Sequence, residues 1–152
     1  MSRKINLEAA PVTTGSRYPE PYDEPCRARH RTRLGDAAGL TQFGVNLLEL
    51  PPGAWSSQRH WHSAEDELVY VVEGEVVLVT NAGEQTLRAG DSAGFKSGVA
   101  DGHQLQNRSG RKAIVLEIGS RRPDEDEVDY PDIDLKVPRG RNGYTRKDGT
   151  RY

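Results

Sequence analysis

Short apolar segments separated by glycine- and proline-rich turns dominate the middle of the chain. The apolar segments cover residues 41–50, 67–80 and 112–119, and a weaker alternating segment covers residues 103–107. Valine-rich segments of this length favour strands, because β-branched side chains pack well on a pleated surface. Turn signals recur at Pro51-Pro52-Gly53, Glu73-Gly74 and Asn81-Ala82-Gly83, and no segment has a helical period. The pattern therefore predicts an all-β sandwich or barrel.

Composition divides the chain into three zones. Residues 1–39 are rich in proline and charge, and we expect an extended arm with one short strand near Ile5–Leu7. Residues 40–119 hold the apolar segments and therefore the predicted barrel. Residues 120–152 form a polar tail, in which residues 124–134 carry seven acidic side chains and no basic one, before the chain turns basic. We expect these charged runs to stay in water, or to pair with one another or with a second subunit.

Length and charge narrow the classes of function. A chain of 152 residues fits one domain, and 21 basic against 23 acidic residues give no electrostatic reason to expect a nucleic acid or a membrane as partner. No apolar run reaches membrane-span length, the first residues lack a signal-peptide stretch, and the single Cys26 cannot form an internal disulfide. We therefore expect a cytoplasmic protein. The basic run Cys26–Arg33 could bind an anion, although a solvated connection is the simpler interpretation.

Two of the four histidines, His60 and His62, are separated by one residue. Because side chains alternate along a strand, both would point to one face and Trp61 to the other. Glu67 follows near the start of the next strand, and His103 begins another strand after a glycine-rich loop. Taken singly, each of these residues has an ordinary explanation on a surface or in a turn. Together, three imidazoles and a carboxylate are a common way to hold a divalent metal.

The same stretches resemble the two sequence motifs of the cupin family. The order of the first motif is matched by Gly53, His60, His62, Glu67 and Gly74, with one extra residue before His60. The order of the second is matched by Gly90, Gly98, His103 and Asn107, although Lys96 replaces a proline and the loop before His103 is longer. The resemblance covers residues 40–119 and implies a double-stranded β-helix, or jelly-roll, barrel.

By this resemblance, His60, His62, Glu67 and His103 would bind one divalent metal ion, either Fe, Mn, Zn, Ni or Co. Three neutral donors and one charged donor leave two positions of an octahedron open for water or substrate. The resemblance also implies a homodimer in which the arm of one subunit covers the sheet edge of its partner, since bare strand edges aggregate. Alternation from Glu67 would place Val69 and Val71 on the metal side and Tyr70 away from it, and Asn107 would fix a turn.

Three functions remain open at this point. The first is a small metalloenzyme, a dioxygenase, isomerase or lyase, acting on an oxygen-rich metabolite such as an organic acid or a sugar phosphate. Small proteins resembling this one are often described as sugar-phosphate isomerases, but the sequence offers no convincing general base. The second is a non-catalytic module that binds a metal and a small molecule. The third is a structural role in which the metal only stabilises the barrel.

Overall fold

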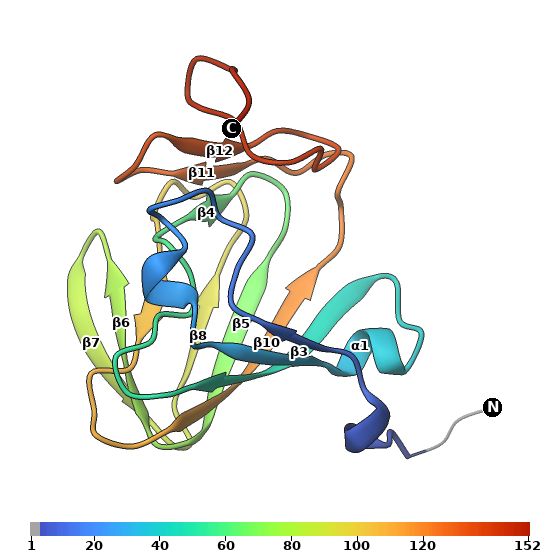
Figure 1. Ribbon diagram of the computed structural model, residues 1–152, viewed down its shortest axis with the longest axis vertical. Helices are drawn as coiled ribbons and strands as arrows, with labels where there is room; N and C mark the ends of the chain where they lie inside the picture. Colours follow the sequence, from blue (N-terminus) through green and yellow to red (C-terminus); the bar gives the residue numbers. More distant parts are fainter. Residues whose placement is uncertain (1–3) are drawn as a thin grey trace.

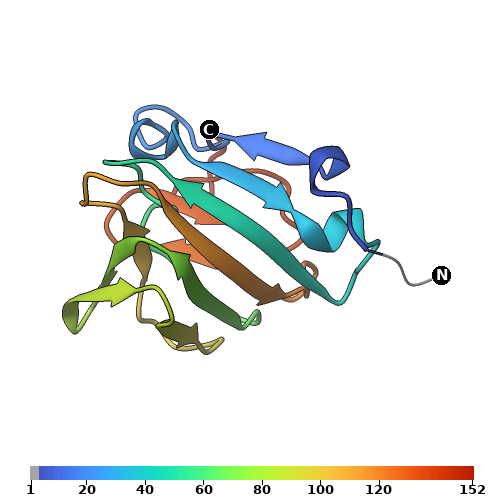
Figure 2. The same cartoon turned by 90° about the horizontal axis from the view of Figure 1, so that it is seen from below.

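Two antiparallel sheets face one another and form the body of the protein in this computed structural model, which describes residues 4–152 (Figures 1 and 2). The larger sheet has the order β1 (Val12–Thr14), β2 (His30–Arg33), β3 (Phe43–Leu50), β10 (Ala113–Ser120), β5 (Glu67–Glu73) and β8 (Ser92–Phe95). The smaller sheet has the order β7 (Gly83–Arg88), β6 (Glu75–Thr80) and β9 (Gln104–Gln106). The predicted all-β jelly-roll fold is therefore confirmed.

A third sheet closes one end of the barrel, where Figure 1 shows the C-terminal strands lying across β4. Its order is β12 (Leu135–Val137), β11 (Val128–Tyr130) and β4 (Trp61–His62). In β4, Trp61 pairs with Asp129 and His62 with Val128. The C-terminal tail is thus attached by backbone hydrogen bonds to the short strand that carries the His-x-His pair.

The helical segments are all very short. They are η1 (Leu7–Ala9), η2 (Glu24–Cys26) and α1 (Leu34–Ala37), and within residues 4–152 no helix has the length and apolar character needed to cross a membrane. The expectation of a strand near Ile5–Leu7 is wrong, because Ile5 and Asn6 have no regular secondary structure, η1 begins at Leu7 and β1 begins only at Val12. The Asn6 side chain accepts a hydrogen bond from the Glu8 N–H, and such a local bond favours a turn over an extended strand.

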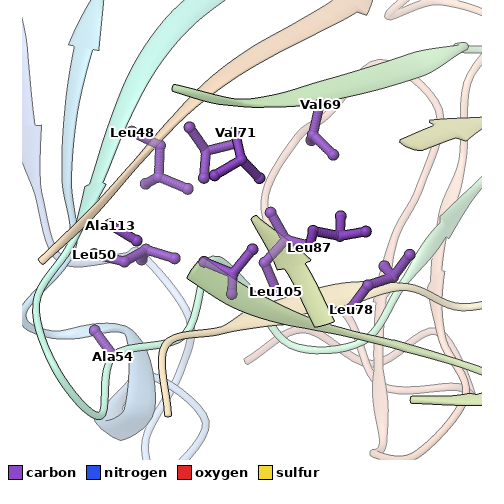
Figure 3. Close-up of a cluster of buried hydrophobic side chains, with 11 residues drawn as sticks. Leu48, Leu50, Ala54, Val69, Val71, Leu78, Leu87, Leu105 and Ala113 are labelled. Carbon is purple, nitrogen blue, oxygen red and sulfur yellow. The ribbon is translucent and has the colours of Figure 1, made fainter. Parts of the chain in front are cut away.

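The hydrophobic core lies between the two facing sheets (Figure 3). Val69 and Val71 point into it from β5, whereas Tyr70 is 42% exposed on the outer face, as strand alternation predicts. The core is completed by Leu48, Leu50, Ala54, Val76, Leu78, Leu87, Leu105, Ala113 and Val115. This packing holds the strands that carry the functional side chains in a fixed register.

Gly74 marks the passage of the chain from one sheet to the other. The chain bends at Gly74, but the predicted tight turn between paired strands is wrong, because β5 pairs with β10 and β8 whereas β6 pairs with β7 and β9. Gly74 has a φ of 77°, and a Cβ built there would lie 2.8 Å from the carbonyl oxygen of Lys112. Both the backbone conformation and the close approach therefore require glycine at this corner.

Candidate metal centre

The four residues singled out by the sequence converge inside the barrel. The Nε2 atoms of His60 and His103 lie 3.6 and 2.7 Å from Oε2 of Glu67, and Nε2 of His62 lies 3.5 Å from Oε1 of Glu67. One ligand atom from each of His60, His62 and Glu67 lies within 4.8 Å of the other two. Three imidazole nitrogens therefore lie around one carboxylate, as the resemblance to the two motifs implies.

Backbone pairing brings His60 and His103 together although 42 residues separate them in the chain. The N–H of His60 donates to the carbonyl oxygen of His103 at 3.1 Å, and the N–H of His103 donates to that of His60 at 2.9 Å. The Phe95 ring stacks on the His103 imidazole, with ring centroids 3.6 Å apart and planes 2° from parallel. These contacts leave the His103 ring little freedom to rotate.

Hydrogen bonds behind two of the imidazoles determine which nitrogen faces the centre. The Nδ1 atom of His60 lies 2.9 Å from the carbonyl oxygen of Gln58, and Nδ1 of His62 lies 2.7 Å from a carboxylate oxygen of Asp126. Because only a protonated Nδ1 can donate to these oxygens, Nδ1 of each ring carries a proton, and Nε2 is the nitrogen that faces Glu67 and could bind a metal. A carboxylate behind a histidine is a common support for a metal ligand.

Charge effects at the centre favour an ionised Glu67. Burial alone would raise the pKa of Glu67, but its polar contacts with His103, His60 and His62 hold that pKa well below its usual value. Burial lowers the pKa of His103 despite the nearby Glu67 carboxylate. For His62, burial also lowers the pKa, but Asp126 and Glu67 outweigh it and raise the pKa to about 9.

One buried oxygen shows that the residues fit a cation. Oε2 of Glu67 has no hydrogen-bond partner, because Nε2 of His103, although close, is not in hydrogen-bonding geometry. A buried carboxylate oxygen without a donor carries a large desolvation penalty. A divalent ion between this oxygen and the three Nε2 atoms would remove that penalty, and imidazole nitrogen with carboxylate oxygen is a donor set that suits first-row transition metals.

Sequence reasoning missed a charged cluster behind His62. Asp126 and Glu65 are 0% and 2% exposed, and Arg141 forms ion pairs with both. Asp126 also accepts hydrogen bonds from the N–H groups of Ala64 (2.9 Å) and Glu65 (3.2 Å). The expectation that the acidic run stays in water is therefore wrong for Asp126. It is buried because β11 and β12 fold over β4, which no local pattern in the sequence predicts.

Some charges of the acidic and basic blocks pair with one another, which was the alternative to fully solvated runs. Lys147 lies 2.8 Å from Asp129, and Arg139 lies 3.3 Å from Glu127. Asn107 also behaves as predicted, since its side-chain amide donates to the carbonyl oxygens of Leu50 and Arg111 and so fixes a turn.

A cavity of about 390 Å³ opens onto the centre and is lined in part by His60, Glu67 and His103. Its volume falls within the range of small-molecule sites. The basic run also contributes to this cavity, because Arg29 and Arg31 line it and Arg29 is only 7% exposed. The interpretation of this run as a solvated connection is therefore wrong for Arg29. Arg31 forms a two-pronged ion pair with Glu117, at 2.6 and 2.9 Å.

The chain is similar in sequence and structure to known proteins of one β-barrel family. The Cupin domain family matches residues 46–119. A crystal structure of a sugar phosphate isomerase from a cupin superfamily, from Silicibacter pomeroyi, is 42% identical with a TM-score of 0.91, over 99% of this chain and 96% of that chain. A proposed sugar phosphate isomerase from Acidithiobacillus ferrooxidans is 33% identical with a TM-score of 0.72, over 78% and 74% of the two chains.

More distant structures share the fold alone. A predicted oxalate decarboxylase from Thermotoga maritima is 18% identical, with a TM-score of 0.61 over 79% of this chain and 100% of that chain. No functionally curated protein shows significant sequence similarity to the chain.

Proposed function

The chain belongs to the cupin superfamily, and we propose that it holds one divalent metal ion at His60, His62, Glu67 and His103 and acts there on a small oxygen-rich metabolite. The observation that carries this proposal is the buried carboxylate of Glu67, whose Oε2 has no hydrogen-bond partner and faces Nε2 of His60 and His103, while its Oε1 faces Nε2 of His62. When bound, the metal would supply a Lewis acid that polarises a carbonyl, carboxylate or hydroxyl oxygen. Fe, Mn, Zn, Ni and Co all suit this donor set.

The protein's own contribution is to hold the donor atoms in one arrangement. Asp126 and the Gln58 carbonyl fix the protonated Nδ1 of His62 and His60, and Phe95 holds the ring of His103. Because these contacts fix the ligand atoms of the imidazoles, little reorganisation of the side chains is needed when a substrate oxygen approaches the centre. These contacts are typical of a preorganised metal site and not of a flexible cluster of surface residues.

The polar side chains that line the cavity are better suited to donate hydrogen bonds than to act as bases. Tyr18 and Tyr144 line it, and burial raises the pKa of both phenols, that of Tyr18 to about 12. Both phenols therefore keep their protons at neutral pH and can donate hydrogen bonds to a substrate oxygen. Glu117, the second carboxylate of the cavity, is held by Arg31. The cavity can therefore bind and orient a substrate through hydrogen-bond donors, whereas Glu117 is not free to abstract a proton from it.

Two functions fit this arrangement. The first is an enzyme, either an isomerase, a lyase or a dioxygenase, with a sugar phosphate or an organic acid as substrate. The two similar proteins described as sugar phosphate isomerases support a sugar phosphate. The second is a non-catalytic module that binds a metal and a metabolite. The engagement of Glu117 by Arg31 favours this second function, since it leaves the cavity without a free carboxylate base other than Glu67.

Metal analysis and turnover assays test the proposal. Protein purified without chelator should contain about one equivalent of a divalent metal. His60→Ala should lose that metal, whereas His30→Ala should keep it, because His30 lies outside the centre and contacts Thr14. Fe, Mn and Zn forms would then be assayed against sugar phosphates and organic acids. Metal-free wild-type protein, or equal metal content in the two variants, would contradict the proposed centre.

The homodimer and the cytoplasmic location stay predictions. The arm supplies β1 and β2 to the sheet of its own chain, where Val12 pairs with Thr32. The outer face of that sheet exposes Leu68, Tyr70 and Val72 of β5, and an apolar face of this kind favours burial against a second copy. Light scattering of Tyr70→Lys against the unaltered protein tests the dimer, since a charge in the interface should yield monomers.

A further inference from the structure

The cavity next to the proposed metal centre carries more positive charge than the protein itself neutralises. Six arginines line it, against only two glutamates, Glu67 and Glu117. Three of the six have carboxylate partners: Arg31 pairs with Glu117, Arg33 with Asp36, and Arg141 with Glu65 and Asp126. Within the part of the chain that the structure describes, the other three form no ion pair; they are Arg17, Arg29 and Arg121.

Arg29 is the most unusual of these three. Its side chain is almost completely buried, yet its only hydrogen bonds among the described residues go to two backbone carbonyl oxygens, those of Gly15 and Ser56. Neutral carbonyls satisfy donor atoms but do not balance a charge. A buried cation without a counter-charge is costly, and burial together with neighbouring Arg31 accordingly lowers the pKa of Arg29.

The backbone around Ser56 connects Arg29 to the candidate metal centre. The carbonyl oxygen of Ser56 accepts hydrogen bonds from both Arg29 and Arg31, so the two guanidinium groups lie side by side. The next residue, Ser57, contacts Nδ1 of His60 through its hydroxyl at 3.3 Å. Arg29 and His60 therefore line the same cavity and are connected through the adjacent residues Ser56 and Ser57.

We propose that Arg29, with Arg17 and Arg121 at the exposed rim, forms a subsite that binds an anionic substituent, a phosphate or a carboxylate, of a molecule whose oxygen atoms reach the metal. Arg29 is the anchor, because it is already fixed and desolvated and lacks a counter-ion. Arg17 and Arg121 are exposed residues of the cavity lining, where they can contact a bound anion. The role of the subsite in turnover rests on the proposed metal function, but anion binding itself does not.

The chemistry of the guanidinium group supports an anion over a neutral ligand. Arginine presents several donors in a planar fork that matches the oxygen atoms of phosphate and carboxylate. A neutral polyol could accept hydrogen bonds here but would leave the charge of Arg29 uncompensated. The substrate class is therefore a small phosphorylated or carboxylated compound that also carries an oxygen ligand for the metal.

Calorimetric titration of the full-length protein tests the subsite. Inorganic phosphate and acetate serve as the phosphate and carboxylate probes, and glycerol as the neutral control. Each is titrated into protein stripped of metal with a chelator that is then removed, and into protein reloaded with Mn²⁺. We expect phosphate or acetate to bind the metal-free protein, and Arg29→Gln to weaken that binding by about ten- to a hundredfold, as expected for loss of a hydrogen bond to a charged group.

A matched control and a second variant keep the test decisive. Arg111→Gln removes an exposed arginine outside the cavity and should leave anion binding unchanged. If Arg29→Gln fails to fold, the double variant Arg17→Gln/Arg121→Gln alters only exposed side chains and should still weaken binding about tenfold. Tighter binding of phosphate than acetate would assign a phosphorylated substrate, and the reverse order a carboxylated one.

The outcomes separate this subsite from the proposed metal function. Anion binding that depends on Arg29 in a protein that never retains a metal would support the subsite and contradict the metal centre. Anion binding that requires Mn²⁺ and is unchanged in every arginine variant would overturn the subsite and leave the metal centre intact. The absence of any phosphate or acetate binding would also overturn the subsite.

Discussion

Replacing Asp126 with asparagine probes the contact that positions His62. In the structure, Oδ2 of Asp126 lies 2.7 Å from Nδ1 of His62, while Oδ1 accepts backbone hydrogen bonds from Ala64 and Glu65. Asparagine can keep the two backbone hydrogen bonds through its single oxygen. Its amide nitrogen would then face Nδ1 of His62, where it can only donate. We therefore expect His62 to shift its proton to Nε2, which removes the lone pair that would bind the metal.

The expected loss follows from what such supporting groups contribute elsewhere. Removal of a hydrogen-bond partner behind a metal ligand commonly lowers metal affinity by about 10- to 100-fold, which corresponds to roughly 1.4–2.7 kcal/mol. Here the upper half of that range is expected, because Asp126 is fully buried and water cannot take its place. A negative charge close to the bound cation is lost as well.

Competition with a coloured chelator at fixed pH measures the affinity. Asp124→Asn is the matched control, since Asp124 belongs to the same acidic run but is exposed. Thermal melting of both variants without metal would show that each still folds. A metal affinity for Asp126→Asn within about twofold of the wild-type value, in a folded protein, would refute the role given to Asp126.

Two further predictions concern stability. Arg141→Ala should lower the free energy of unfolding by about 1–3 kcal/mol in urea titration, because it removes the arginine that pairs with the buried carboxylates of both Glu65 and Asp126; an unchanged midpoint would contradict this. In metal-free protein, the pKa of His62 is about 9 when folded against a model value of 6.5. Its protonation therefore stabilises the fold fully below pH 6.5, and this contribution, on the order of 3 kcal/mol, is lost as the pH rises through about 9. Urea titrations at pH 6 and pH 9.5 should differ less in His62→Gln than in the wild-type protein.

The sequence alone determined the features that depend on local periodicity. The β-strands and the inward positions of Val69 and Val71 follow from alternation and from the turn residues between segments. The placement of His60 and His62 on one face follows from the same alternation. The fourth member, His103, was identified because so few histidines were available and because the order of residues resembles two known motifs.

Only the tertiary structure decided which distant residues support and surround this centre. Asp126 lies 64 residues from the histidine that it contacts, and Arg29 precedes the barrel segments in a run that looked solvated. Neither burial has a local signature, because each depends on how strands from the two ends of the chain pair with β4 and β3. The role of a charged side chain depends on whether folding buries it and on whether an opposite charge then lies beside it. Tertiary contacts decide both.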